Sequence, residues 1–206
     1  MQLKKINPNL QKALIENDFT EANEMQEETF SAIKSGVDAV IQGPKKSGKT
    51  TTIIMNVIQK MDKPVGESTR ALILVQDKEK VLEAVEQFKR FNHYNNLRVI
   101  GVHEKGDIDY DKNLISVGMD VLIGTPIRIN EMFTSAGFNM NTIKMFVVDD
   151  VEEMLRKRED TLIDRLSSSV DKTQRLFFCT QITEKVEILA DRIMIEPLFF
   201  EMEDEA

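Results

Sequence analysis

The stretch GPKKSGKTTT at residues 43–52 decides how this chain is expected to fold. Its first eight residues match the pattern G-x-x-x-x-G-K-[S/T] without a mismatch. A β-branched run, DAVIQ (38–42), precedes the stretch, and TTTIIMNVIQKM (50–61), with helical character, follows it. A strand, a glycine-containing loop and a helix in this order place backbone N–H groups around phosphate. The stretch therefore predicts a nucleotide-binding loop, and the alternative is a chance turn in a lysine-rich segment.

This loop predicts which residues would contact a nucleotide. They are Gly43, Pro44, Lys45, Lys46, Ser47, Gly48, Lys49, Thr50 and Thr51. In such loops the lysine, here Lys49, lies against the β and γ phosphates, and the hydroxyl that follows it, here on Thr50, binds Mg²⁺. We therefore expect ATP or ADP together with Mg²⁺ as cofactors.

A second run, MFVVDDVEEML (145–155), supplies two carboxylates at the end of a buried strand. Asp149 is expected to hold Mg²⁺ through its water shell, and Asp150 to orient the attacking water. With Lys49 they form the predicted catalytic set. The alternative is that both carboxylates cap a helix at 151–158, since Asp is a good N-cap residue. The two roles are compatible.

The rest of the chain alternates between strand and helix patterns. Short apolar runs predict strands at 38–42, 71–75, 97–102, 120–124, 144–149, 175–179 and 192–200. Helical spacing appears at 78–91, with Val81, Leu82, Val85 and Phe88 on one stripe, and at 183–192. Residues 8–34 predict two helices with a break at 18–23. This order predicts an α/β fold, a three-layer α/β/α sandwich with a mostly parallel central sheet and its ligand site at the carboxyl ends of the strands.

Composition narrows the classes of function. The 206 residues carry a net charge of −8, which argues against a constitutive, sequence-indifferent nucleic-acid binder. The acidic end EMEDEA (201–206) is expected to be a solvated terminus. No stretch resembles a signal peptide or a membrane span, so we expect a cytoplasmic protein without membrane contact. The single cysteine, Cys179, is expected to be a buried, inert thiol.

In the order of these segments, the chain resembles the first RecA-like domain of the DEAD-box ATP-dependent RNA helicases over essentially its whole length. DFTEANEMQEETFSAIKSGVDAVIQG (18–43) is similar to the family's adenine-recognition element. The resemblance implies that Gln26 reads the base through its side-chain amide; the alternative is a surface glutamine on a helix. The family's upstream stacking aromatic has no equivalent in MQLKKINPN, and Ala22 and Asn23 replace a Pro and a Thr.

The family's RNA-contacting segments are partly altered. Its Pro-Thr-Arg has become Gln76-Asp77-Lys78, while Thr125-Pro126-Ile127-Arg128 resembles its TPGR motif. The resemblance implies that Lys78, Thr125 and Arg128 contact nucleic acid, more weakly than in the family because Lys78 lacks the bidentate fork of arginine. Alternatively, Thr125 and Pro126 only begin a helix.

The family's Asp-Glu-Ala-Asp motif reads Asp149-Asp150-Val151-Glu152 here. Asp150 is shorter than the catalytic Glu, and a misplacement of about 1 Å can cost on the order of a hundredfold in rate. The family's Ser-Ala-Thr segment, which links the nucleotide to the last acid of that motif, aligns with residues 179–181, and its partner acid is Glu152. This link is therefore either rebuilt or lost.

The resemblance also implies a second RecA-like domain, which we do not expect within residues 1–206. The chain is expected to be one RecA-like helicase ATP-binding domain, with N-terminal helices and the adenine element in residues 1–36. It would bind ATP or ADP with Mg²⁺, associate weakly with RNA, and show little hydrolysis or unwinding without a second helicase domain in trans. The alternative is a non-enzymatic, helicase-like module that regulates a helicase or an RNA-protein complex. An ordinary P-loop kinase finds no support, because no lid-like arginine segment stands out.

Overall fold

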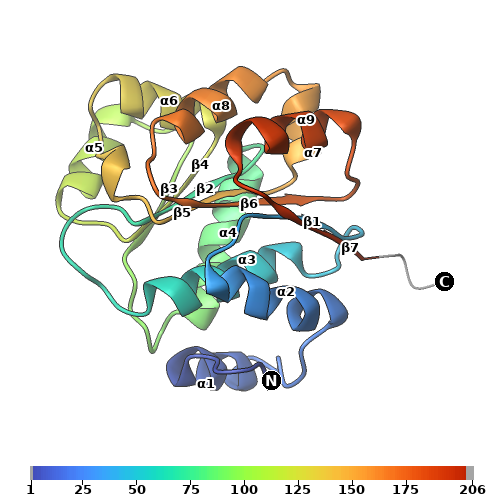
Figure 1. Cartoon of the computed structure of the whole chain (residues 1–206). Coiled ribbons are helices and arrows are strands. Elements are labelled where there is room, and N and C mark those ends of the chain that lie inside the picture. Colours follow the sequence, from blue (N-terminus) through green and yellow to red (C-terminus); the bar gives the residue numbers. More distant parts are fainter. Residues whose placement is uncertain (1, 203–206) are drawn as a thin grey trace.

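The computed structural model describes residues 2–202 and contains a seven-stranded sheet in the order β3-β4-β2-β5-β6-β1-β7 (Figure 1). The strands are β1 Ala39–Gln42, β2 Ala71–Leu74, β3 Val99–Val102, β4 Val121–Gly124, β5 Met145–Val148, β6 Gln174–Cys179 and β7 Leu198–Glu201. All six neighbouring pairs within the described residues are parallel. The prediction of an α/β fold with a mostly parallel sheet is confirmed.

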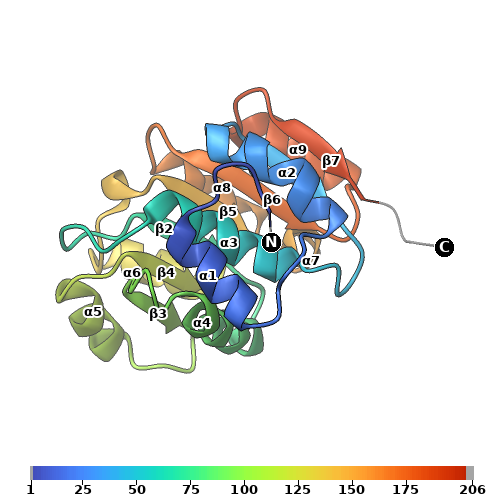
Figure 2. The ribbon, with the colours of Figure 1, turned by 90° about the horizontal axis from the view of Figure 1, so that it is seen from below.

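Helices cover both faces of this sheet. They are α1 Pro8–Glu16, α2 Glu24–Ser35, α3 Lys49–Met61, α4 Lys78–Phe91, α5 Ile108–Ser116, α6 Pro126–Thr134, α7 Val151–Arg156, α8 Asp160–Ser168 and α9 Glu184–Ile193. Figure 1 shows α2, α3 and α4 below the sheet and α5 to α9 above it. The helix α1 packs outside α3 and α4, as the view from below shows (Figure 2). The three predicted layers are present, with α1 added outside one of them.

The strands are apolar on both sides because each faces two helical layers. In β1, Ile41 packs in the core cluster that includes the residues of α2 to α4, whereas its neighbour Val40 packs in the cluster on the other face. The β2 residues Ile73 and Leu72 divide in the same way. Since successive side chains of a strand point to opposite faces, a parallel strand between two helical layers reads as a continuous apolar run.

The last strand was placed wrongly from the sequence. Residues 192–200 were expected to be one strand, but α9 continues to Ile193 and β7 begins only at Leu198. Val186, Leu189 and Ala190 are buried, and Ile193, partly buried against the same cluster, continues their helical spacing. The apolar residues of 193–200 therefore belong to two elements, the end of α9 and the strand β7.

One residue of the α4 stripe was also assigned to the wrong side. Val81 and Phe88 are buried as expected, but Leu82 is 53% exposed. The buried stripe runs through Val81, Ala84, Phe88 and Phe91, which repeat at helical spacing. Leu82 follows Val81 directly and so points about 100° away from it around the helix.

The helices of residues 2–202 give no candidate for a membrane span, since none is both long and apolar enough. The cytoplasmic location stays a prediction. Of the acidic end EMEDEA, residues 203–206 lie outside the described part of the chain.

Candidate functional site

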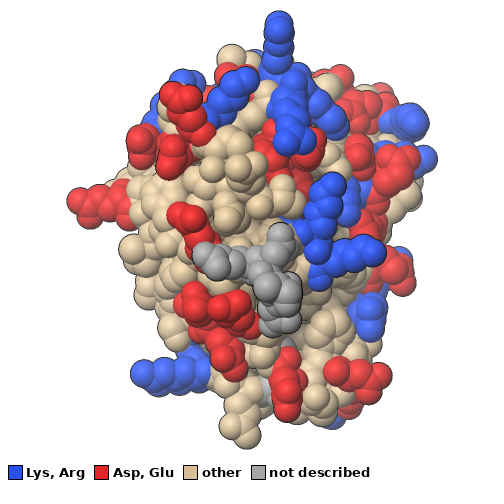
Figure 3. Space-filling model, turned by 90° about the vertical axis from the view of Figure 1, so that its right-hand side faces the viewer, with Lys and Arg blue, Asp and Glu red and all other residues tan. Residues whose placement is uncertain are grey.

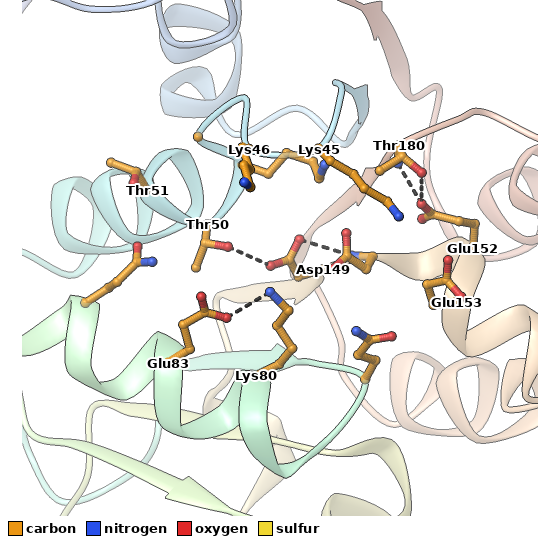
Figure 4. A pocket seen from close by; sticks show the side chains of 15 residues that line it. Lys45, Lys46, Thr50, Thr51, Lys80, Glu83, Asp149, Glu152, Glu153 and Thr180 are labelled. Carbon is orange, nitrogen blue, oxygen red and sulfur yellow. Dashed lines mark hydrogen bonds and ion pairs between the residues drawn. The ribbon is translucent and has the colours of Figure 1, made fainter.

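The candidate site is a cleft of about 720 Å³ beyond the carboxyl ends of neighbouring strands. Its lining comes from the loop after β1, from Asp149 after β5 and from Thr180 after β6. Residues from the first three turns of α4 close it on one side. Figure 4 shows Lys45 and Lys46 on the opposite side of the cleft from Lys80. The site therefore lies at the sheet edge where doubly wound folds bind their ligands.

The loop 43–48 holds a conformation that its two glycines permit. A Cβ on Gly43 would lie 2.1 Å from the Met25 side chain and 2.8 Å from Ser47 Oγ, so only glycine lets these groups approach. Gly48 has φ +86° and stands immediately before α3. The first N–H groups of a helix have no partner within the helix, and those of α3 begin at Lys49. The loop thus presents donors with the positive end of a helix behind them.

Asn23 and Gln26 tie this loop to α2. Asn23 Nδ2 donates to the Ser47 carbonyl over 2.8 Å, and Asn23 and Gln26 form a reciprocal capping box. Gln26 is 3% exposed, so the alternative of a surface glutamine is wrong. Its side chain lines a second cavity of about 350 Å³, together with Phe19, Lys46 and other residues of the loop region. Gln26 therefore combines a helix-capping role with a position beside the phosphate loop.

Lys49 and Thr50 lie where the sequence motif requires them. Lys49 is 8% exposed, and its ammonium group donates to the carbonyls of Gly43 (2.9 Å) and Pro44 (3.0 Å). The Thr50 hydroxyl donates to Asp149 Oδ2 over 3.2 Å, which joins the start of α3 to the residue after β5 (Figure 4). The predicted phosphate ligand and both predicted Mg²⁺ ligands are thus within one site.

Asp149 lies in an environment that suits a cation. It is 4% exposed, and this burial, together with the neighbouring charge of Asp150, raises its pKa to about 7. Lys49 acts in the opposite direction. A divalent ion beside Asp149 would favour its charged form and relieve the cost of burying it. This position therefore fits the hard oxygen ligand that Mg²⁺ prefers.

Asp150 does not cap α7 with its side chain, so the helix-capping alternative is wrong for this residue. It occupies the N-cap position in the left-handed region (φ 50°), and no hydrogen bond joins its side chain to the start of the helix. The backbone N–H of Asp150 donates to the neighbouring carboxylate oxygen, Asp149 Oδ1. Burial raises the pKa of Asp150 as well. Asp150 therefore lines the cleft with a side chain that does not cap the helix.

The loop and the carboxylates pass a test of fit for a nucleotide and Mg²⁺. Two buried polar atoms, Ser47 Oγ in the loop and Glu152 Oε2 in the cleft lining, have no hydrogen-bond partner among the described residues. The donor set consists of backbone N–H groups and lysines for phosphate, and a hydroxyl with a carboxylate for a hard cation. This donor set matches both groups chemically.

Glu152, the acid that follows β5, contacts the segment that follows β6. Glu152 Oε1 accepts hydrogen bonds from both the backbone N–H (2.7 Å) and the hydroxyl of Thr180. Glu152 is 4% exposed, and the contact joins α7 to the residue that follows β6 (Figure 4). The contact between the two segments is therefore present, and its link to a bound nucleotide stays a prediction.

Glu152→Asp is expected to lower the free energy of unfolding by about 1–2 kcal/mol, because the shorter carboxylate withdraws from the two Thr180 donors. Chemical denaturation would measure this. Glu153→Asp is the matched control, since Glu153 is partly exposed and its carboxylate pairs with Arg156 on the same helix. Equal loss in both variants would contradict a specific Glu152–Thr180 contact.

Two of the three predicted nucleic-acid contacts lie at helix starts. Lys78 is the half-buried first residue of α4, and Asp77 caps that helix by accepting from Lys80 N over 2.9 Å. Thr125 is buried and caps α6 by accepting from Arg128 N, so its structural role is confirmed. Their contact with RNA stays a prediction.

Arg128 has other partners in the place where a phosphate contact was expected. Its guanidinium donates to the carbonyls of His103, Glu104 and Gly106 and to Glu131. Its side chain is 5% exposed. An RNA phosphate would have to displace these bonds. The arrangement supports a structural role that holds the loop at 103–106.

The face of the molecule drawn in Figure 3 carries mixed charge. On the side shown in Figure 3, Lys and Arg side chains alternate with Asp and Glu. A backbone-binding surface normally gathers positive charge along one face.

Sequence reasoning missed the α4 side of the cleft. Lys80, Glu83 and Gln87 line it, and none was among the predicted site residues. Their spacing of three and four residues places them on one face of α4, so helical periodicity was a usable signal. Cys179, in contrast, is buried as expected, and desolvation raises its pKa to about 12.

Comparison with known proteins gives a consistent result. A family profile described as DEAD/DEAH box helicase matches residues 23–188. The chain is 24% identical over 196 residues to the DEAD-box ATP-dependent RNA helicase CshC of Bacillus cereus, covering 95% of this chain and 50% of that protein. It is 24% identical over 181 residues to the ATP-dependent RNA helicase eIF4A of Yarrowia lipolytica, covering 87% and 46%. The chain thus spans about half the length of these curated relatives.

A solved structure agrees in fold. The crystal structure of a DEAD box protein from the hyperthermophile Methanococcus jannaschii superposes with a TM-score of 0.90 at 19% identity, covering 97% of this chain and 55% of that one. The resemblance inferred from the sequence is therefore confirmed, and this chain belongs to the DEAD/DEAH box helicase family, in which it corresponds to the N-terminal RecA-like domain.

Proposed function

We propose that this domain binds ATP or ADP with Mg²⁺ in the cleft at the carboxyl ends of β1, β5 and β6. The observation that carries the proposal is the preformed phosphate loop, with buried Lys49 inside it and the Thr50 hydroxyl on Asp149. A chance turn has no reason to bring a lysine, a hydroxyl and a carboxylate from distant strands into one cleft. This geometry supports nucleotide binding over the chance-turn alternative.

Each residue has a role that follows from its position. The N–H groups at the start of α3 and the Lys49 ammonium would bind the phosphates, while Thr50 and Asp149 would hold Mg²⁺. Bound Mg²⁺ neutralises phosphate charge. Gln26 lies beside the loop, where its amide can both donate to and accept from a base edge.

For catalysis, the proposal is slow hydrolysis. Asp150 would orient the attacking water, but its carboxylate is one methylene shorter than that of Glu. The relatives named as ATP-dependent RNA helicases are about twice as long as this chain, so we propose that efficient turnover requires a second helicase domain that completes the cleft. RNA association is proposed to be weak, because Arg128 is engaged elsewhere and Asp77 adds a negative charge beside Lys78.

A direct test is titration of fluorescent ADP and ATP into the protein, with Mg²⁺ or with EDTA. Saturable binding that strengthens when Mg²⁺ is present supports the proposal. Absence of saturation at millimolar nucleotide would contradict it.

The second candidate is a helicase-like interaction module without enzymatic activity. The engagement of Arg128 and the capping role of Asp77 favour it, since both remove expected RNA contacts. The intact phosphate loop disfavours it, because an interaction module does not need Lys49 and Thr50 at the positions that the phosphate-loop pattern requires. If the titration shows no binding, this candidate becomes the better explanation.

Asp150→Glu is expected to raise ATP hydrolysis by about tenfold to a hundredfold when a helicase second domain is supplied in trans, because the longer side chain returns the carboxylate to the attacking water. Steady-state phosphate release would measure this. Asp150 has φ 50°, so thermal unfolding of the variant must first show that it stays folded. An unchanged rate in a folded variant would mean that Asp150 is not what limits turnover.

A further inference from the structure

Lys80 is a cation in the cleft that does not belong to the phosphate loop. It lies in the first turn of α4 and lines the same cleft as Thr50 and Asp149. Figure 4 shows its ammonium group directed from α4 toward these two residues, while Lys45 and Lys46 approach from the other side. A ligand between the two sides would therefore have positive charge on both.

The charges around the cleft make this position unusual. Its lining contains Lys45, Lys46 and Lys49 from the loop, and the acids Glu83, Asp149, Asp150, Glu152 and Glu153 from the remaining elements. Among the described residues that line the cleft, Lys80 is the one cation outside the loop. A phosphate group that extends from the loop toward Asp149 and Asp150 would, without Lys80, have only the Mg²⁺ proposed at Thr50 and Asp149 to offset the acids on that side.

The present partner of Lys80 does not fix it in place. Its ammonium lies 2.8 Å from Glu83 Oε2, three residues along the helix, with the two side chains 37% and 54% exposed. Exposed pairs of this kind are weak, so a phosphate can compete with Glu83 for the ammonium. The pKa of Lys80 is raised, mainly by Glu83 and also by Asp150 and Asp149, which keeps the side chain charged.

We infer that Lys80 binds the terminal phosphate of a nucleoside triphosphate, and that it makes this site select triphosphate over diphosphate. The inference rests on the proposed nucleotide binding. The loop N–H groups serve the phosphates common to both nucleotides, and Lys49 reaches both the β and the γ phosphate. Lys80 stands across the cleft beside the acids. The additional phosphate of a triphosphate would reach that side, where Lys80 adds to the charge of Lys49 and of bound Mg²⁺ in offsetting the carboxylates.

The test is the pair of dissociation constants for ATP and ADP, measured with Mg²⁺ by calorimetry on wild-type protein and Lys80→Met. Loss of one charge-assisted contact is expected to weaken ATP binding about tenfold and ADP binding less than about twofold. Lys80→Arg, which keeps the charge, is expected to retain most of the ATP preference. Lys89→Met is the matched control, because Lys89 pairs with Glu86 at the same spacing on the same helix, away from the cleft lining.

The outcomes separate the two proposals. If wild type binds neither nucleotide, nucleotide binding itself is refuted, and the role of Lys80 with it. If wild type binds both and Lys80→Met weakens both equally or neither, only the inference on Lys80 is overturned. A thermal unfolding temperature equal to that of wild type shows that the variant is folded, as the exposed Lys80–Glu83 pair leads us to expect.

Discussion

Lys49→Ala is expected to weaken the binding of ATP and of ADP by about a hundredfold or more. Lys49 is the buried cation at the start of α3, and its ammonium donates to the carbonyls of Gly43 and Pro44. These bonds hold it beside the loop where we propose that the phosphates bind. Contacts between a lysine and phosphate are charge-assisted, and losing about 2.7 kcal/mol of such contacts corresponds to that factor.

A control variant, Lys45→Ala, distinguishes loss of the Lys49–phosphate contact from loss of any positive charge in the loop. Lys45→Ala removes a cation from the same loop, but Lys45 is exposed, so its effect is expected to stay below about tenfold. Fluorescent-nucleotide titrations of both variants and of wild type give the comparison. Equal weak signals from wild type and Lys49→Ala would reject nucleotide binding through this loop.

Asp120→Ala is expected to cost about 3 kcal/mol of unfolding free energy, the largest stability effect that we predict. Asp120 is fully buried just before β4, at the opposite edge of the sheet from the cleft. Its carboxylate accepts from Arg70 Nη2 (2.8 Å), from Arg98 Nε (2.8 Å) and from the backbone N–H of Val65. The backbone N–H of Arg98 also donates to it, so truncation removes an acceptor from two guanidinium groups and two backbone donors.

The same contacts predict how stability changes with pH. Desolvation of Asp120 opposes its charge, but the hydrogen bonds from Arg98 and Arg70 outweigh it and lower the pKa from 3.8 to about 2. Because the folded-state pKa lies below the unfolded value, the stabilisation is complete above about pH 4. It is lost as the pH falls through that range toward 2.

Urea unfolding of wild type and Asp120→Ala between pH 2 and pH 7 tests both statements. The difference between the two proteins is expected to be largest near neutral pH and to shrink as the pH falls from about 4 toward 2. Asp191→Ala, an exposed aspartate on α9, is the control and is expected to change little. A stability loss that is the same for both variants would contradict the proposed role of the Asp120 cluster.

The parts of the molecule that local sequence encodes were predictable. The glycines, lysine and threonine of residues 43–50 stand at a fixed spacing because they all belong to one short segment between a strand and a helix. The structure has the strand, loop and helix in that order. The other strands up to β6 were found for a related reason, since burial between two helical layers leaves a continuous apolar run. The acidic pair at 149–150 was located by the same logic, at the end of such a run.

What could not be predicted depends on contacts between segments far apart in the sequence. Arg128 matched a motif, but the loop at 103–106 that engages its guanidinium is visible only in three dimensions. In the sequence, nothing distinguishes Asp120 from other polar residues at strand starts. Its ion pairs with Arg70 and Arg98 appear only in the structure. Gln26 likewise caps a helix and also lines a cavity. The sequence alone does not show which of these two roles a glutamine at this position has.

The central claim is that the loop at 43–51 is shaped to receive phosphates, and amide chemical shifts measured while ADP and Mg²⁺ are added to ¹⁵N-labelled wild-type protein test it most directly. The account predicts that the largest shifts fall on residues 43–51, with smaller ones at Gln26 and Asp149. A competing basic pocket lies at the amino ends of the strands, lined by Lys60, Lys144 and Lys172 among others. Shifts centred on that pocket, or none at millimolar ADP, would contradict the claim.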